Sequence, residues 1–249
     1  MYYIAGLTTQ IPPQAVEGLA VFTTLRFFQY SVSRARAIAA VAKAESGAIR
    51  TRPTTFMGRF VTPIHLSTSS ISSMTYVLCI AGNMFKQPAW MQCMSLSNDY
   101  FQQETKVALR IAACASTFVL LRFVGSTFTH LGNQWHVIGV RIFLTKYSCV
   151  EDIYKLTAPQ QRREKPRVVQ TGPYALVRHP LYTQMLMQQA LAAVMFWSYV
   201  PLVGFGIIAG AFSIKIPIEE DLILSDPAIA TEYRAYMQKV PARVIPFLW

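Results

Sequence analysis

The residues Thr171–Tyr182, TGPYALVRHPLY, stand directly before the last long apolar block of the chain. A Gly-Pro pair near the start of this stretch is a turn signal. Pro180 is favoured in the first turn of a helix, where its missing N–H costs nothing. We therefore expect a turn followed by a helix that begins close to His179. Free N–H groups of that helix start, with Arg178 beside them, would bind a small anionic group.

The apolar block at residues 181–216 is too long for one membrane-crossing helix. About 20 residues span the hydrocarbon core of a bilayer, and the polar residues of Ser198–Pro201 fall near the middle of this block. The block therefore predicts a tight hairpin of two helices. Gly204, Gly206 and Gly210 in the second arm would allow another backbone to approach closely.

The composition of the whole chain is typical of a membrane protein. Of its 249 residues, 53% are hydrophobic and 14% are charged, whereas soluble domains have about 25% charged residues. The net charge of +11 comes from basic loops between apolar segments, which favours contact with anionic lipid over nucleic acid. The sequence contains no zinc-finger or RNA-recognition pattern, and its four cysteines form no CxxC pair that would indicate a metal site.

Three earlier apolar segments, at residues 14–33, 66–85 and 107–125, are also predicted to cross the membrane. Serine and threonine at the start of the second segment suit packing between helices rather than contact with lipid. Arg110 and Arg122 of the third segment are expected to extend toward its two ends. Together with the hairpin, these segments predict an all-α, polytopic transmembrane bundle of about five spans.

Counts of lysine and arginine predict the orientation of this bundle. The loop at residues 34–59 has six, the connector at residues 126–180 has eight, and the loop at residues 86–106 has two. By the positive-inside rule the first two face the cytosol and the third faces the lumen. The hairpin then opens on the cytosolic side, where the C-terminal tail also lies. Within the connector, His136–Cys149 is semi-apolar and would lie along the interface as an amphipathic helix.

Further motifs follow the apolar block. Glu219 and Glu220 form an acidic pair, and the tail continues with YRAY and VPARVIPF. The chain thus contains, in this order, GPYxxVRHPxY, a predicted helical hairpin of about 35 residues, the acidic pair and this tail. This ordered set of motifs resembles that of the isoprenylcysteine carboxyl methyltransferase family. The resemblance covers Leu131–Trp249. It divides the chain into N-terminal transmembrane helices with a basic loop, at 1–130, and a methyltransferase region, at 131–249.

The resemblance implies an integral membrane enzyme of the endoplasmic reticulum, with a cytosolic cofactor pocket for S-adenosyl-L-methionine. Its reaction would be methyl transfer to the C-terminal carboxylate of a prenylated cysteine in a lipidated protein or peptide. The residues that would line the cofactor pocket are Pro166, Arg167, Val168, Val169, Tyr174, His179, Pro180, Leu181, Tyr182 and Glu219.

Individual roles follow from the same resemblance. Glu219 would bind the ammonium or the ribose hydroxyls of the cofactor, whereas Glu220, about 100° away on a helix, would be structural. Lys215 stands where the family has a substrate-binding arginine, and a lysine binds a carboxylate as a point charge rather than as a fork. Pro217 is expected to break the helix between Lys215 and Glu219.

The implied reaction needs no dedicated general base, because a substrate carboxylate is already ionised at neutral pH. Transfer from a sulfonium to a carboxylate cancels two opposite charges, so a site that excludes water favours it. The lipid chain of the substrate would approach from the bilayer.

Other functions remain open at this point. A phospholipid N-methyltransferase would use the same cofactor but would need a base near the methyl group. A sterol-type membrane reductase would use a nicotinamide cofactor instead. A third alternative is a non-catalytic membrane scaffold that has lost its enzymatic activity. The motif stretch is also consistent with a basic turn that places tyrosines at the lipid interface.

Overall fold

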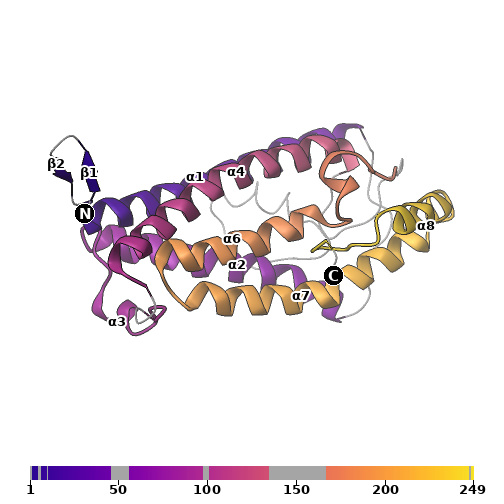
Figure 1. Cartoon of the computed structure of the whole chain (residues 1–249). Helices are drawn as coiled ribbons and strands as arrows, with labels where there is room; N and C mark the ends of the chain where they lie inside the picture. Colours follow the sequence, from indigo (N-terminus) through magenta and orange to yellow (C-terminus); the bar gives the residue numbers. More distant parts are fainter. Residues whose placement is uncertain are drawn as a thin grey trace.

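The computed structural model describes residues 2–4, 7–9, 11–45, 56–97, 101–134, 167–246 and 248–249, and the account below concerns these residues. They form a bundle of long helices, with a short antiparallel pair of strands beside its N-terminal end (Figure 1). The elements are β1 (Tyr2–Ile4), β2 (Leu7–Thr9), α1 (Pro13–Glu45), α2 (Phe56–Gly82), α3 (Ala89–Gln92), α4 (Gln103–Leu131), η1 (Gly132–Gln134), η2 (Gly172–Ala175), α6 (Pro180–Phe196), α7 (Val200–Leu224) and α8 (Ala230–Lys239).

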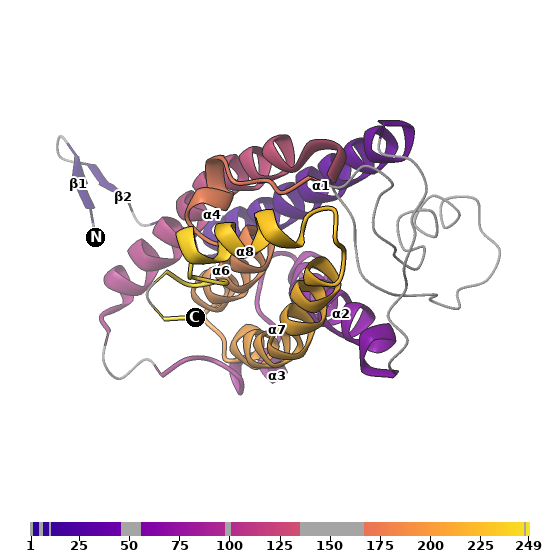
Figure 2. The ribbon, with the colours of Figure 1, turned by 90° about the vertical axis from the view of Figure 1, so that its right-hand side faces the viewer.

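Helix α6 lies at the centre of the bundle. It packs against α4 and α7, and it also contacts α1 and α2. Its C-terminal half is buried, with Ala192, Met195 and Phe196 in a core that also contains residues of α1, α2 and α4. Viewed from the other end of the bundle, α8 crosses in front of α6 (Figure 2) and packs against α7. The N-terminus of α6 therefore meets the C-terminus of α7 under α8.

The predicted hairpin in residues 181–216 is confirmed. Helices α6 and α7 are joined by a turn at Trp197, which takes a left-handed conformation (φ 53°) at the C-terminal end of α6. The Ser198 hydroxyl accepts a hydrogen bond from the Val200 N–H (3.2 Å), and Pro201 lies in the first turn of α7, where it is well tolerated. The local signals in the sequence were therefore sufficient to locate this turn.

The helix boundaries in the first half differ from those expected. Helix α1 continues to Glu45, so residues 34–45 are helical rather than part of a loop. The reason is an apolar stripe, because Ala35, Ile38 and Ala39 pack against the core around Phe128 while charged residues occupy the other face. Helix α2 begins at Phe56 rather than at residue 66, and α4 extends beyond 107–125 at both ends.

Three helices of the described chain are long and apolar enough to cross a membrane, at Phe60–Gly82, Gln103–Leu131 and Val200–Leu224. The serine-rich start of the second predicted segment faces other helices only in part, since Ser69 and Ser73 are buried whereas Ser67 and Ser70 are exposed. Helices α1 and α6 were also expected to cross the membrane, and that part of the topology stays a prediction.

Glycines in α7 play a smaller part in packing than the sequence indicated. A methyl group added at Gly204 would come within 3.1 Å of the Gln189 side chain on α6. Within the described residues, a methyl group at Gly206 or Gly210 would meet nothing within 4 Å. Close helix approach is therefore limited to Gly204.

An ion pair is buried between α1 and α4. The Arg110 guanidinium lies 2.7 Å from a Glu17 carboxylate oxygen, and its Nε donates a hydrogen bond to the Met195 carbonyl of α6 (2.7 Å). Arg110 is only 6% exposed, so the expectation that it extends to the helix end is wrong. The nearby carboxylate and carbonyl offset part of the desolvation cost of burying the arginine. Arg122, by contrast, is exposed.

Candidate functional site

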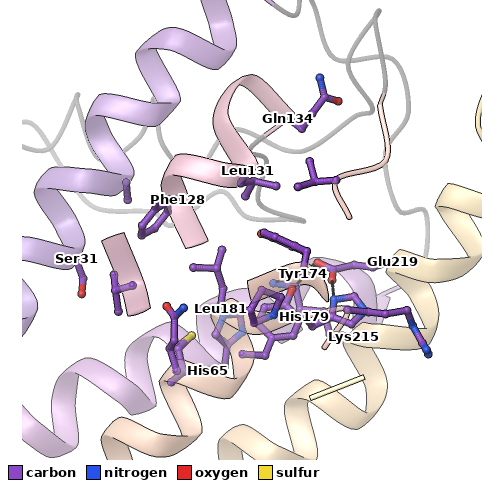
Figure 3. A pocket seen from close by; sticks show the side chains of 18 of the residues that line it. Ser31, His65, Phe128, Leu131, Gln134, Tyr174, His179, Leu181, Lys215 and Glu219 are labelled. Atoms are coloured by element: carbon purple, nitrogen blue, oxygen red, sulfur yellow. Dashed lines mark hydrogen bonds and ion pairs between the residues drawn. The ribbon is translucent and has the colours of Figure 1, made fainter. Parts of the chain in front are cut away.

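A cavity of about 410 Å³ lies between the N-terminus of α6 and the C-terminus of α7. This volume is within the range of small-molecule sites, about 300 to 1,000 Å³. Helices from both regions expected from the sequence, 1–130 and 131–249, form its walls. Figure 3 shows Tyr174, His179, Lys215 and Glu219 close together on one side and Phe128 and Ser31 on the other.

One half of the cavity is apolar. Its wall comes from α1, α2, α4 and α6, and it includes Phe27, Val32, Leu66, Val124, Phe128 and Met185. All four of these helices contain segments that the sequence predicted to cross the membrane. This half of the cavity is suited to a hydrocarbon chain, because aliphatic and aromatic side chains offer no hydrogen bonds that a chain would leave unmet.

The other half is polar, and the sequence motifs meet there. The predicted site residues that line it are Arg167, Val168, Val169, Tyr174, His179, Pro180, Leu181, Tyr182, Lys215 and Glu219. Pro166 lies outside the described residues. The structure therefore brings three separate stretches of the C-terminal half to one cavity wall.

The rim of the polar half joins two distant parts of the chain. The Gln134 side-chain oxygen accepts a hydrogen bond from the Arg167 N–H (2.9 Å). Gln134 ends η1, directly after α4, and both residues line the cavity. The predicted interfacial helix at His136–Cys149 lies outside the described residues.

Two cavity residues, His179 and Tyr182, belong to a stack of aromatic rings that continues into α7. The His179 ring stacks on Tyr182 (5.4 Å between ring centres, 3° between planes), and Tyr182 stacks on Phe212 of α7 (4.1 Å, 16°). The Tyr182 hydroxyl donates a hydrogen bond to Glu219 Oε1 (2.6 Å). The first turn of α6 is therefore fixed against α7 by stacking and by a charge-assisted hydrogen bond.

The predicted anion site at the start of α6 is largely occupied by the protein itself. The Arg178 side chain bonds the Glu220 carboxylate (2.8 Å) and the carbonyls of Val240 (2.7 Å) and Pro241 (2.6 Å). The His179 N–H donates to the Arg243 carbonyl (2.8 Å). The expectation that Arg178 adds free positive charge to an anion site is therefore wrong, because the tail packs there and consumes its donors.

The two adjacent glutamates have different surroundings. Glu220 is 3% exposed and is surrounded by Arg178, His179 (3.3 Å) and Arg243 (3.1 Å). Glu219 lines the cavity, and its carboxylate also lies 3.5 Å from His179 Nδ1. Successive residues of a helix point about 100° apart, which places one carboxylate in the cavity and the other in the bundle.

Lys215 and Glu219 lie on one face of an unbroken helix. Helix α7 continues through Pro217 to Leu224, so the expected break between the two residues is absent. Burial of Ile216 against Phe212 and other core residues holds the segment in place, and tertiary packing outweighs the lost hydrogen bond. Lys215 Nζ lies 3.8 Å from the Glu219 carboxylate and 5.0 Å from the centre of the Tyr182 ring.

Three tyrosines cover the outer wall of the polar half. The Tyr236 hydroxyl donates to the Tyr174 carbonyl (2.6 Å), and the Tyr233 ring packs 5.8 Å from that of Tyr236. Burial raises the pKa of all three phenols above the ordinary value, so they remain neutral at physiological pH. The sequence analysis quoted Tyr233 and Tyr236 within the tail motif but did not assign them to the site.

His65 of α2 is a cavity residue that the sequence analysis missed. It lines the cavity and is 2% exposed, and its ring lies 5.1 Å from Phe212 and 6.2 Å from Tyr182. The signal that could have identified it is an ionisable residue within a membrane-crossing segment, which marks a candidate functional position. It went unnoticed because the predicted segment began one residue later.

No family model matches the chain, and a search of curated proteins finds no match. Function must therefore be inferred from the chemistry of the cavity. Within the part of the chain that the structure describes, no group of three or more His, Cys, Asp or Glu residues could hold a metal ion.

Proposed function

We propose that the protein is a membrane-embedded methyltransferase that transfers a methyl group from S-adenosyl-L-methionine to the C-terminal carboxylate of a prenylated cysteine. The observation that carries this proposal is a single cavity with two chemically different halves. The polar half is lined by the motif residues, and the apolar half is formed by helices of the bundle. A cavity of this kind suits a polar nucleoside together with a lipid chain.

The polar half offers groups that match the cofactor. Glu219 would accept hydrogen bonds from an ammonium group or from ribose hydroxyls, and the rings of Tyr174 and Tyr182 would pack against a cation or a base. When bound, S-adenosyl-L-methionine supplies a methyl group on a positively charged sulfonium. Because Arg178 is already bonded to Glu220, its guanidinium is assigned to holding the tail rather than to the cofactor.

Lys215 would orient the substrate. It lines the cavity and is buried beside Glu219, where an ammonium attracts a second carboxylate as a point charge. A carboxylate held there would have the apolar half available for its hydrocarbon chain. Binding in this orientation lowers the entropic part of the barrier.

The remaining chemistry is the exclusion of water. A substrate carboxylate enters already ionised, and the surrounding rings and aliphatic groups keep the local dielectric low. Because the reaction cancels opposite charges, a dry site lowers its barrier. The proposal therefore assigns no general base for the carboxylate reaction.

The proposed placement in the membrane adds α1 and α6 to the three apolar helices, giving five spans. Helix α6 is about 26 Å long at 1.5 Å per residue, close to the thickness of the hydrocarbon core. The basic segments after α1 and after α4 would face the cytosol. The cavity would then open toward the cytosolic surface of the endoplasmic reticulum.

Two measurements on the full-length protein in lipid nanodiscs test the proposal. The first compares binding of S-adenosylhomocysteine with binding of NADPH, and we expect only the former to bind. The second follows radiolabelled methyl transfer to N-acetyl-S-farnesylcysteine. Preferential binding of NADPH would indicate a reductase rather than a methyltransferase. Binding of S-adenosylhomocysteine without any methyl transfer would favour an inactive scaffold.

One observation favours a second candidate, a phospholipid N-methyltransferase. Methylation of an amine requires a base, and the His65 imidazole lies in the cavity wall. Phosphatidylethanolamine added to the same transfer assay separates the candidates. Radiolabel found in the phospholipid rather than in the farnesylcysteine would identify the protein as a phospholipid N-methyltransferase.

A further inference from the structure

His65 has one ring nitrogen committed to the protein and one that is not. Its Nδ1 lies 2.9 Å from the Val61 carbonyl, one helical turn earlier in α2. A carbonyl oxygen only accepts hydrogen bonds, so Nδ1 carries the proton in this contact. In the neutral ring, Nε2 then has a free lone pair and is a hydrogen-bond acceptor. No described residue donates a hydrogen bond to it.

The surroundings of His65 place this acceptor beside the proposed substrate carboxylate. The centre of the Tyr182 ring is 6.2 Å from the His65 ring and 5.0 Å from Lys215 Nζ. His65 and Lys215 both line the cavity. Both groups therefore lie around the Tyr182 ring in the same cavity, so a ligand that pairs with Lys215 through its carboxylate can present a neighbouring group to the His65 acceptor.

A buried acceptor without a donor selects for ligands that supply one. Leaving such a group unpaired in a closed site costs binding free energy, so an analogue that lacks the donor is rejected. A plain lipid carboxylic acid has no donor next to its ionised carboxylate. An N-acylated amino acid, or the last residue of a peptide, carries an amide N–H directly on the carbon that bears the carboxylate.

We infer that His65 is a substrate-binding residue whose Nε2 accepts a hydrogen bond from the amide N–H adjacent to the substrate carboxylate. The cavity then selects peptide-like head groups over simple lipid acids. This inference rests on the proposed function, which places the substrate carboxylate at Lys215. It assigns to the first half of the chain a part in recognising the substrate head group.

The test uses two ligands that differ at one position. One is N-acetyl-S-farnesylcysteine, and the other is its ester analogue, in which the amide N–H is replaced by oxygen. Dissociation constants are measured for the full-length protein in nanodiscs with S-adenosylhomocysteine present. We expect the amide to bind roughly tenfold more tightly than the ester, the effect of one buried hydrogen bond.

Two variants separate recognition from a structural role. In H65N, the side-chain amide can keep the bond to the Val61 carbonyl but does not reach the position of Nε2, so the affinity ratio should fall to about one. In H65Q, the longer side chain can bring an oxygen near that position and should restore part of the preference. Binding of S-adenosylhomocysteine reports whether each variant is folded.

Each result decides the inference. Equal affinity of the wild-type protein for both ligands, no binding of either ligand, or an unchanged ratio in H65N would overturn it. Methyl transfer is measured on the same samples and reports separately on the proposed function. If the protein prefers the amide ligand but transfers no methyl group, the inference about His65 holds and the proposed reaction is wrong. If it transfers methyl groups but binds both ligands equally, the proposed reaction holds and the inference about His65 is wrong.

Discussion

The two ends of the bundle both bury charged side chains, yet they differ in what those charges can contact. At the end near the β1–β2 hairpin, Glu17 and Arg110 are paired with each other, and Arg110 also bonds the Met195 carbonyl. At the other end, Lys215 and Glu219 are paired but also line a cavity. Burial of charge is therefore common to both ends, and access to a cavity distinguishes the end where we place the chemistry.

Helix α6 connects these two ends. Its C-terminal turn accepts the hydrogen bond from Arg110, and its N-terminal turn contains the stacked Tyr182. Removal of one partner from a buried ion pair leaves an uncompensated charge and is strongly destabilising. We therefore expect variants at the first end to change stability alone, and variants at the second end to separate into structural and binding effects.

The largest effect is expected for Arg110→Ala. The variant leaves the Glu17 carboxylate buried without its partner, which costs about 3 to 5 kcal/mol of unfolding free energy. Unfolding by titration with SDS would measure this loss. The double variant Glu17→Leu with Arg110→Met removes both charges and should recover most of the stability. A single variant as stable as the wild type would contradict a structural role for this pair.

The next largest effects are expected for variants of the two adjacent glutamates, which should differ in whether they change cofactor binding or stability. Glu219→Gln should weaken binding of S-adenosylhomocysteine by roughly 10- to 100-fold, the effect of a charge-assisted hydrogen bond, and change stability little. Glu220→Gln should instead lower the unfolding free energy, since Arg178 and Arg243 lose their partner. Isothermal titration and SDS unfolding on both variants provide the comparison. The reverse pattern would exchange the two assignments.

A smaller effect is expected at the turn before α6. Gly172 has a left-handed backbone (φ 60°), and an added methyl group would lie 2.6 Å from the His130 ring. Gly172→Ala should cost about 1 to 2 kcal/mol of unfolding free energy from the backbone alone, and more where the His130 ring does not move. Gly206→Ala, in an exposed part of α7, is the control and should be neutral or slightly stabilising.

The smallest effect is expected for Lys215→Met. The substrate analogue should bind roughly tenfold more weakly, because a buried point charge is lost, while the affinity for S-adenosylhomocysteine should stay within about twofold. Titration of each ligand alone provides the comparison. A larger loss for the cofactor than for the substrate would move Lys215 from the substrate side to the cofactor side of the cavity.

Features set by nearby residues could be predicted from the sequence, and features set by packing could not. The turn at Trp197 and the helix start at Pro180 follow from local signals. The predicted site residues come from three separate stretches that packing brings to one cavity, so the resemblance, and not local signals, grouped them. The bonding of Arg178 to the tail and the continuity of α7 through Pro217 depend on contacts between segments far apart in the chain. His65 was missed because the predicted second segment began one residue after it, and its place in the cavity depends on the packing of α2 against α7.

The hydrogen bond between Gln134 and Arg167 joins the end of α4 to the motif residues that precede α6. Both residues line the cavity. A shift of α4 relative to the start of α6 would therefore move both sides of the cavity wall together.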